Sequence, residues 1–155
     1  MRSLSALCAG VLLTAGIAGC SEATTKPQPE SIETATFATS LGVDLAASTK
    51  TAQGVYLRDL TVGTGATITT NDSVAVRYTG YLKDGTSFNS NERPGDPLLE
   101  RRLGQQQLLG AFEAGMVGMK VAGVRQIIIP PSLGYPSGEL EGRIMVFRVT
   151  MVAKR

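Results

Sequence analysis

The sequence contains no histidine, and its two cysteines lie close to the N-terminus. Without imidazole, the usual forms of Ser-His-Asp, Cys-His and HExxH chemistry are excluded. Cys8 and Cys20 both fall within the first twenty residues, so they cannot supply a disulfide framework or a zinc site to the rest of the chain. We therefore expect no metal and no cofactor, and any catalysis must proceed without imidazole.

Net charge is also small, because 15 Lys and Arg residues stand against 13 Asp and Glu residues, a formal charge of +2. A near-neutral chain has no electrostatic tendency to bind nucleic acid, and we expect none among its partners. With 155 residues, of which 43% are apolar, the chain is long enough for one packed domain.

The first nineteen residues have the pattern of a secretory signal peptide. Arg2 is followed by an almost wholly apolar or small stretch, residues 4–17, which is shorter than the roughly 20 residues that a membrane-spanning helix needs. Residues 17–20, Ile-Ala-Gly-Cys, resemble a bacterial lipobox. We expect Cys20 to be lipidated and to hold the mature protein on a membrane in the bacterial periplasm, and Ser21 resembles the residue that directs lipoproteins to the outer membrane. The alternatives are an ordinary secretion signal or an uncleaved anchor helix, with an incidental cysteine.

Residues 20–53 are rich in Ser, Thr, Ala and Glu and lack a sustained apolar period. This composition predicts a flexible tether between the lipidated N-terminus and a domain at residues 54–155. A weak helix over residues 31–46, carrying Phe37, Leu41, Val43 and Leu45, is the alternative, and such a helix could serve in dimerisation.

From Gly54 onward, short runs of β-type residues alternate between apolar and polar positions. Residues 145–151 show this best, with an apolar residue at every second position: Met145, Phe147, Val149 and Met151. A single helical pattern lies between such runs, formed by Leu108, Leu109, Phe112 and Met116 at spacings that place them on one side of a helix. We predict an α+β fold in which a twisted antiparallel sheet wraps around one short α-helix.

Two local signals set strand ends. Asp84-Gly85 joins two strand-like runs and predicts a tight turn. Pro130-Pro131 must close the strand over residues 124–129, since proline cannot donate to a sheet ladder.

Several motifs of this region resemble, in order and in spacing, those of FKBP-type peptidyl-prolyl isomerases. The resemblance covers about residues 54–152. It is carried by Val76-Arg77-Tyr78-Thr79-Gly80, Asp84-Gly85-Thr86, Phe88, Phe112-Glu113-Ala114-Gly115, Ile127 to Pro131, Leu133-Gly134-Tyr135 and Val146-Phe147.

The resemblance implies an FKBP-like fold, catalysis of cis/trans rotation at X-Pro bonds and a pocket for the prolyl ring. It implies Phe112 as the floor of the pocket, with the N–H of Leu109 and the hydroxyl of Tyr135 bonding substrate carbonyls. The catalytic residues that it implies are Tyr78, Phe88, Asn89, Leu109, Phe112, Tyr135 and Phe147, with Leu98 and Leu108 binding substrate. The expected partners are X-Pro segments of exported polypeptides, and binding of macrolides is left open. On their pattern alone, Phe112 and Phe147 would be read as ordinary core residues.

Such a reaction is compatible with a chain that lacks histidine. The planar amide is held by a barrier of about 18–20 kcal/mol that arises from C–N double-bond character. Twisting the bond reduces the charge on the carbonyl oxygen, so an apolar pocket favours the twisted state over the planar one. No covalent nucleophile is required.

The sequence departs from the family pattern at four places. Asn89 stands where the family usually has aspartate, Phe112 where it usually has tryptophan, and Leu98 where an aromatic residue often follows the proline. The long loop after Tyr135 is reduced to residues 136–142, which carry two glutamates. These departures favour an alternative function, a catalytically weak module of the same fold that binds envelope proteins or acts as a chaperone.

Overall fold

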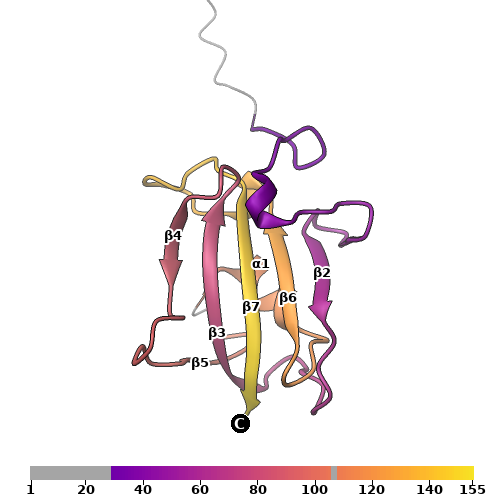
Figure 1. The fold of residues 1–155 in the computed structure, drawn as a ribbon, viewed down its shortest axis with the longest axis vertical. Helices are drawn as coiled ribbons and strands as arrows, with labels where there is room; N and C mark the ends of the chain where they lie inside the picture. The colour runs from indigo at the N-terminus through magenta and orange to yellow at the C-terminus, as the bar shows by residue number, and fades with distance from the viewer. Residues whose placement is uncertain (1–28, 106–107) are drawn as a thin grey trace, which may run out of the picture.

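The computed structural model describes residues 29–105 and 108–155, which form one antiparallel sheet with a short α-helix against it (Figure 1). The elements run in the order η1 (Thr39–Leu41), β1 (Thr49–Lys50), β2 (Tyr56–Thr61), β3 (Ser73–Leu82), β4 (Ser87–Ser90), β5 (Leu99–Arg102), α1 (Gly110–Met116), β6 (Val124–Ile129), η2 (Pro131–Leu133) and β7 (Met145–Lys154). The sheet order is β1-β2-β6-β7-β3-β4, with β5 also paired to β3. The α+β prediction is confirmed.

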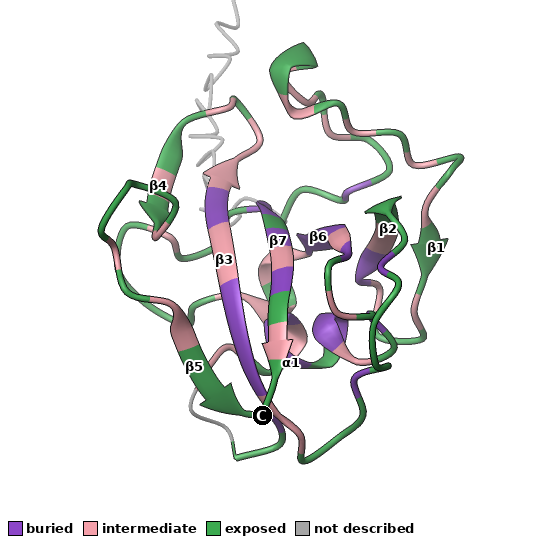
Figure 2. Cartoon of the chain, turned by 60° about the horizontal axis from the view of Figure 1, so that its bottom comes forward, coloured by how far each residue is buried: buried purple, intermediate pink, exposed green. Residues whose placement is uncertain are grey.

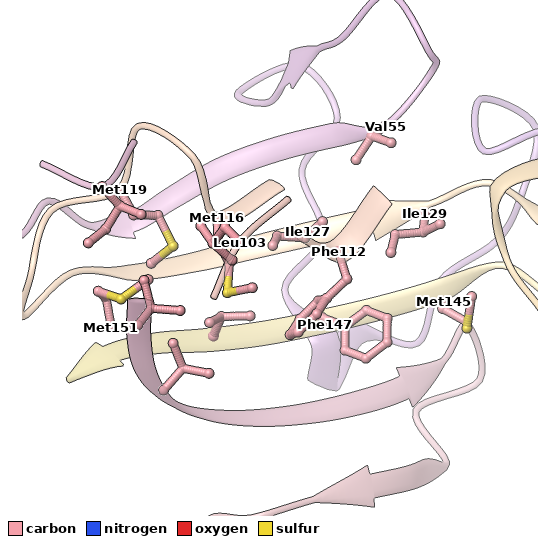
Figure 3. Close-up of a cluster of buried hydrophobic side chains, with 14 residues drawn as sticks. Val55, Leu103, Phe112, Met116, Met119, Ile127, Ile129, Met145, Phe147 and Met151 are labelled. Carbon is pink, nitrogen blue, oxygen red and sulfur yellow. The ribbon is translucent and has the colours of Figure 1, made fainter. Parts of the chain in front are cut away.

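The face of the sheet that meets the helix carries the main core. All four residues of the predicted alternation in β7 are buried on this side, with Phe147 4% exposed and the others fully buried. Figure 3 shows Met145, Phe147 and Met151 with Phe112 and Met116 of α1 and Ile127 of β6. A Cβ atom on Gly115 would lie 2.7 Å from Cδ1 of Ile127, so only glycine lets the helix lie this close to β6.

Both predicted strand ends are confirmed. In the β3–β4 turn, the Leu82 N–H donates to the Thr86 carbonyl at 2.8 Å, and Gly85 takes a φ of 89° that favours glycine. Strand β6 ends at Ile129, immediately before Pro130. These two ends set the positions of Phe88 and Tyr135, which follow them along the chain.

The edge of β3 is covered by two separate strands, β5 along its first half and β4 along its second. Residues 91–98 form the loop between these two strands. At Tyr78, which neither strand pairs with, Asn91 forms the hydrogen bonds that a neighbouring strand would otherwise supply. The Tyr78 N–H donates to Asn91 Oδ1 at 2.7 Å, and the Asn91 N–H donates to the Tyr78 carbonyl at 3.1 Å. Arg77 secures the same loop by donating to the carbonyls of Asn91 and Asp96.

Residues 29–48 form an arm that packs on the opposite face of the sheet from the helix and leads into β1 (Figure 1). The arm buries Ile32, which is 2% exposed, and packs further apolar side chains over Ile128 and Val146, which point outward from β6 and β7. The structure thus differs from the flexible tether expected for these residues, because an apolar outer face on two central strands gives the arm a surface to bury. It contains a single 3₁₀ turn, η1, in place of the alternative helix over residues 31–46.

Polar contacts fasten the arm at several points. The Glu33 carboxylate accepts hydrogen bonds from Lys50, Ser31 and the Tyr56 hydroxyl, and these donors hold its pKa well below the usual range. The Gln126 side chain donates to the Leu41 carbonyl at 2.8 Å. The predicted signal peptide and Cys20 lie outside the described residues, among which no helix is long and apolar enough to cross a membrane.

Candidate active site

Four aromatic rings from four different elements meet at one end of the core. The ring centroids of Phe112 in α1 and Phe147 in β7 are 4.7 Å apart, and those of Tyr78 in β3 and Phe112 are 5.8 Å apart with the rings at 61°. Phe88 in β4 meets Phe147 edge to face at 5.6 Å and 88°. These separations and tilts are typical of attractive aromatic pairs. The fold therefore brings together four residues that the family resemblance implied, although they span 69 positions in the sequence, from Tyr78 to Phe147.

The aromatic cluster runs from the core to the surface. Phe112 and Phe147 are each 4% exposed, whereas Tyr78 and Phe88 are only partly buried. Figure 2 shows mostly exposed β4 at the edge of largely buried β3. The reading of Phe112 and Phe147 as core residues is thus correct as far as it goes. Four partly buried side chains pack against the core cluster that contains these two rings, and we call them the apolar wall: Tyr78, Phe88, Leu108 and Leu109.

Gly80 is a site residue that the family motif contained but sequence reasoning gave no role. A Cβ atom at this position would lie 2.6 Å from Cζ of Phe88 and 2.9 Å from Cε1 of Phe147. Two rings therefore occupy the space where any other residue would place a side chain. The signal available in the sequence was a glycine interrupting the inward-facing series Val74, Val76 and Tyr78.

The Tyr78 hydroxyl donates to Asn89 Oδ1 at 3.2 Å, so Asn89 retains the acceptor role at this position without a charge. Burial raises the pKa of Tyr78 and neighbouring Tyr135 adds to the rise, while the charge of Arg101 opposes it. The phenol therefore remains protonated, and a hydrogen-bond donor, throughout the neutral pH range.

The chain enters α1 through Leu108 and Leu109, which precede the helix. Both leucines belong to the predicted helical pattern, but Leu109 has a ψ of 120° and the helix starts at Gly110. The Leu109 carbonyl accepts from the N–H of Phe112 and Glu113, while among the described residues no acceptor lies within hydrogen-bonding distance of its own N–H. That N–H is the group expected to bond a substrate carbonyl.

Glu113 holds this entry segment from inside the protein and is a second residue that sequence reasoning missed. Its side chain is buried, at 5% exposed, and accepts from the N–H of Gly104 at 3.0 Å and of Leu108 at 3.1 Å. A buried glutamate on the helix thus sets where Leu108 and Leu109 lie. A charged residue in an apolar helix turn was the available signal.

We expect Glu113→Ala to lower kcat/KM for an X-Pro peptide by about tenfold while the fold persists, because the N–H groups of Gly104 and Leu108 lose the acceptor of their partly buried hydrogen bonds, at a cost of about 1 kcal/mol each. Most of the loss should appear as a raised KM, since the segment that bonds substrate is displaced. Amide exchange at Leu108 should quicken in parallel. Glu100→Ala, which removes an exposed carboxylate paired with Arg155, is the control. Unchanged kinetics with lowered stability would show that Glu113 is purely structural.

Tyr135 lies just after η2 and is 40% exposed. Its hydroxyl has no hydrogen-bond partner among residues 29–105 and 108–155, and Tyr135 adds to the raised pKa of Tyr78. The second predicted donor is therefore also available to a ligand.

The remaining predicted features are Leu98 and the short loop after Tyr135. Leu98 lies in the loop before β5, and Leu99, the first residue of β5, is the leucine that packs against the core cluster. Leu99 pairs with Val76 and so points to the inner face, and its immediate neighbour in an extended chain points elsewhere. Leu98 is also partly buried, and its assignment to substrate binding stays a prediction. In the short loop after Tyr135, Glu139 and Glu141 are exposed.

Within the described parts of the chain, no cluster of three or more acidic, histidine or cysteine side chains could hold a metal ion. The aromatic cluster and the two available donors constitute an uncharged site. Its chemistry is that of binding and orienting an apolar ring and its flanking carbonyl groups.

Comparison with known proteins agrees with this geometry. A family model described as FKBP-type peptidyl-prolyl cis-trans isomerase matches residues 65–152. FK506-binding protein 4 of Chaetomium thermophilum is 39% identical over 93 residues, which are 60% of this chain and 19% of that protein. FK506-binding protein 3 of Candida albicans is 41% identical over 89 residues, 57% of this chain and 20% of that protein. The chain thus spans about a fifth of the length of these curated relatives.

Solved structures share the fold. FkpA from Escherichia coli superposes with a TM-score of 0.61 at 25% identity, covering 70% of this chain and 52% of that one. A peptidyl-prolyl cis-trans isomerase from Pseudomonas syringae pv. tomato gives a TM-score of 0.60 at 24% identity, covering 70% and 80%.

Proposed function

This chain belongs to the FKBP-type peptidyl-prolyl cis-trans isomerase family, and we propose that it catalyses cis/trans rotation about X-Pro bonds of polypeptide substrates. The observation that carries the proposal is the meeting of four aromatic rings beside two unoccupied donors, the Leu109 N–H and the Tyr135 hydroxyl. A prolyl ring would rest on the apolar wall above Phe112, and the donors would orient the carbonyl groups on either side of it.

The apolar environment then lowers the barrier to rotation about the X-Pro bond, because it binds the twisted amide better than the planar one. The planar amide carries more charge on its oxygen than the twisted amide, and an apolar surface stabilises the less polar of the two. The two donors hold the flanking chain in place while the X-Pro bond rotates. No group of the protein needs to gain or lose a proton, in agreement with a site that lacks ionised side chains among its implied catalytic residues.

We further propose that the substrates are exported polypeptides and that the protein works at the periplasmic face of a bacterial membrane, tethered through lipidated Cys20. The support is the sequence of residues 1–20, with its apolar stretch and its lipobox-like end. Mass spectrometry of the membrane-extracted protein should show a diacylglyceryl group on Cys20, and a water-soluble product in the host would contradict this proposal.

A catalytically weak binding module is the second candidate, and two observations favour it. Asn89 accepts the Tyr78 hydroxyl without the charge that the family usually places there, and residues 136–142 offer exposed glutamates in place of an apolar rim. The experiment that separates the two measures exchange of a Leu-Pro peptide by NMR with the full chain in mild detergent. Accelerated exchange supports catalysis, whereas binding without acceleration supports the module.

A further inference from the structure

Arg101 occupies a position in the edge strand β5 that alternation assigns to the face of the sheet that meets the helix. In the pairing of β5 with β3, Arg101 lies opposite Val74 and Leu99 lies opposite Val76. Directly paired residues project from the same face of a sheet, and Val74 and Val76 are both core residues. Leu99 and Leu103, two positions to either side of Arg101, pack into that core as well. The Arg101 side chain therefore leaves β5 on the face that carries the aromatic cluster.

The charge of Arg101 is not neutralised by the protein. Its side chain is exposed and donates to the backbone carbonyl of Glu100 at 2.7 Å. No carboxylate forms an ion pair with it in the described parts of the chain. The acidic residue next to it, Glu100, points to the other face and pairs with Arg155 at 3.0 Å.

Arg101 also acts on the site at a distance. Its charge lowers the pKa of Tyr78 against the effect of burial, so the field of the guanidinium reaches the phenol at the mouth of the aromatic cluster. The implied catalytic residues carry no charge of their own to offset it, because Asn89 replaces the usual acidic residue. Figure 2 shows exposed β5 lying along the edge of β3.

We propose that Arg101 is a specificity-determining residue, which favours X-Pro segments that carry an acidic side chain next to the proline. The inference rests on the proposed function of the site and names the class of substrate that it prefers. An alternative role for an inward-facing charge on an edge strand is to prevent edge-to-edge association of copies, and the test must separate the two.

The test compares host peptides of the form Ala-Xaa-Pro-Phe and Ala-Leu-Pro-Xaa, where Xaa is Glu, Gln or Lys. Rates of cis/trans exchange and dissociation constants are measured with the full chain in mild detergent at low salt. At least one series should favour Glu over Gln by about two- to fivefold, the range expected for a single exposed charge pair. The preference should shrink when ionic strength is raised toward 1 M, where the screening length is about 3 Å.

Arg102 provides a matched control, because it is the adjacent arginine on the opposite face, where it donates to the Asn71 carbonyl at 3.1 Å. Arg101→Gln should abolish the preference for Glu, Arg101→Glu should transfer it to Lys, and Arg102→Gln should leave it unchanged. Exchange of a neutral Leu-Pro peptide should be unaffected by all three.

The proposal would be overturned if the unaltered protein showed equal exchange rates and equal dissociation constants for the Glu and Gln peptides. It would equally be overturned if Arg102→Gln matched Arg101→Gln, or if Arg101→Gln changed only self-association. The proposed function fails separately, if the neutral peptide shows no accelerated exchange. In that case the dissociation constants still decide whether Arg101 selects acidic peptides, and absence of any peptide binding would contradict both.

Discussion

Phe112→Ala should remove nearly all prolyl isomerase activity and about 3–5 kcal/mol of the free energy of unfolding. Phe112 contacts the rings of Tyr78 and Phe147 and is 4% exposed, so the truncation opens a cavity at the base of the aromatic cluster. The apolar wall would then lose its support as well as part of its area. Exchange rates of a Leu-Pro peptide and urea denaturation measure the two effects.

Because Phe112→Ala could lose activity merely by unfolding, Phe112→Leu is the decisive companion. Leucine keeps most of the apolar volume, and we expect this variant to fold with a smaller loss of stability. Its kcat/KM should still fall about tenfold, since aromatic pairs contribute about 0.5–1.5 kcal/mol beyond simple burial. A folded Phe112→Leu protein with unchanged kcat/KM would show that the ring has no part in catalysis.

Ile32→Asp should lower the free energy of unfolding by about 2–3 kcal/mol and leave isomerase activity almost unchanged. Ile32 is 2% exposed and anchors the arm against Tyr56, Ile128 and Val146, on the face of the sheet opposite the aromatic cluster. Burial of one such side chain is worth about 1.5–3 kcal/mol, and aspartate cannot replace it in an apolar contact. Urea denaturation measures the stability, and limited proteolysis should show cleavage within residues 29–48.

Thr36→Asp is the matched control for this prediction, because it introduces the same charge into the same arm at an exposed position. It should change neither stability nor proteolysis. If Ile32→Asp were as stable and as resistant as Thr36→Asp, the arm would contribute nothing to the fold. A large loss of activity in Ile32→Asp would instead show that the two faces of the sheet are coupled.

The sequence was sufficient to predict the elements whose signals are local. Alternation placed Met145, Phe147, Val149 and Met151 on one face of β7, and Pro130 ended β6 where its missing N–H requires. The resemblance to a known family then brought together rings that no periodicity could relate. The proximity of these four rings depends on which strands pair and where the helix packs, and no local sequence signal specifies either: Tyr78, Phe88, Phe112 and Phe147.

The arm could not be predicted in the same way, because its apolar residues follow no single period. The signal lay in the strands that it covers. Residues 127–129 and 145–147 are continuous apolar runs, which is typical of strands buried on both faces and unlike a sheet with one solvated face. One face is covered by α1, so the other required a cover, and residues 29–48 supply it.

Intermolecular NOEs between a bound Leu-Pro peptide and the protein test the central claim most directly. We expect contacts from the prolyl ring protons to the ring of Tyr78 and to the side chains of Leu108 and Leu109, all from one binding site with the proline above Phe112. NOEs that place the prolyl ring elsewhere on the protein, with none to Tyr78, would contradict it.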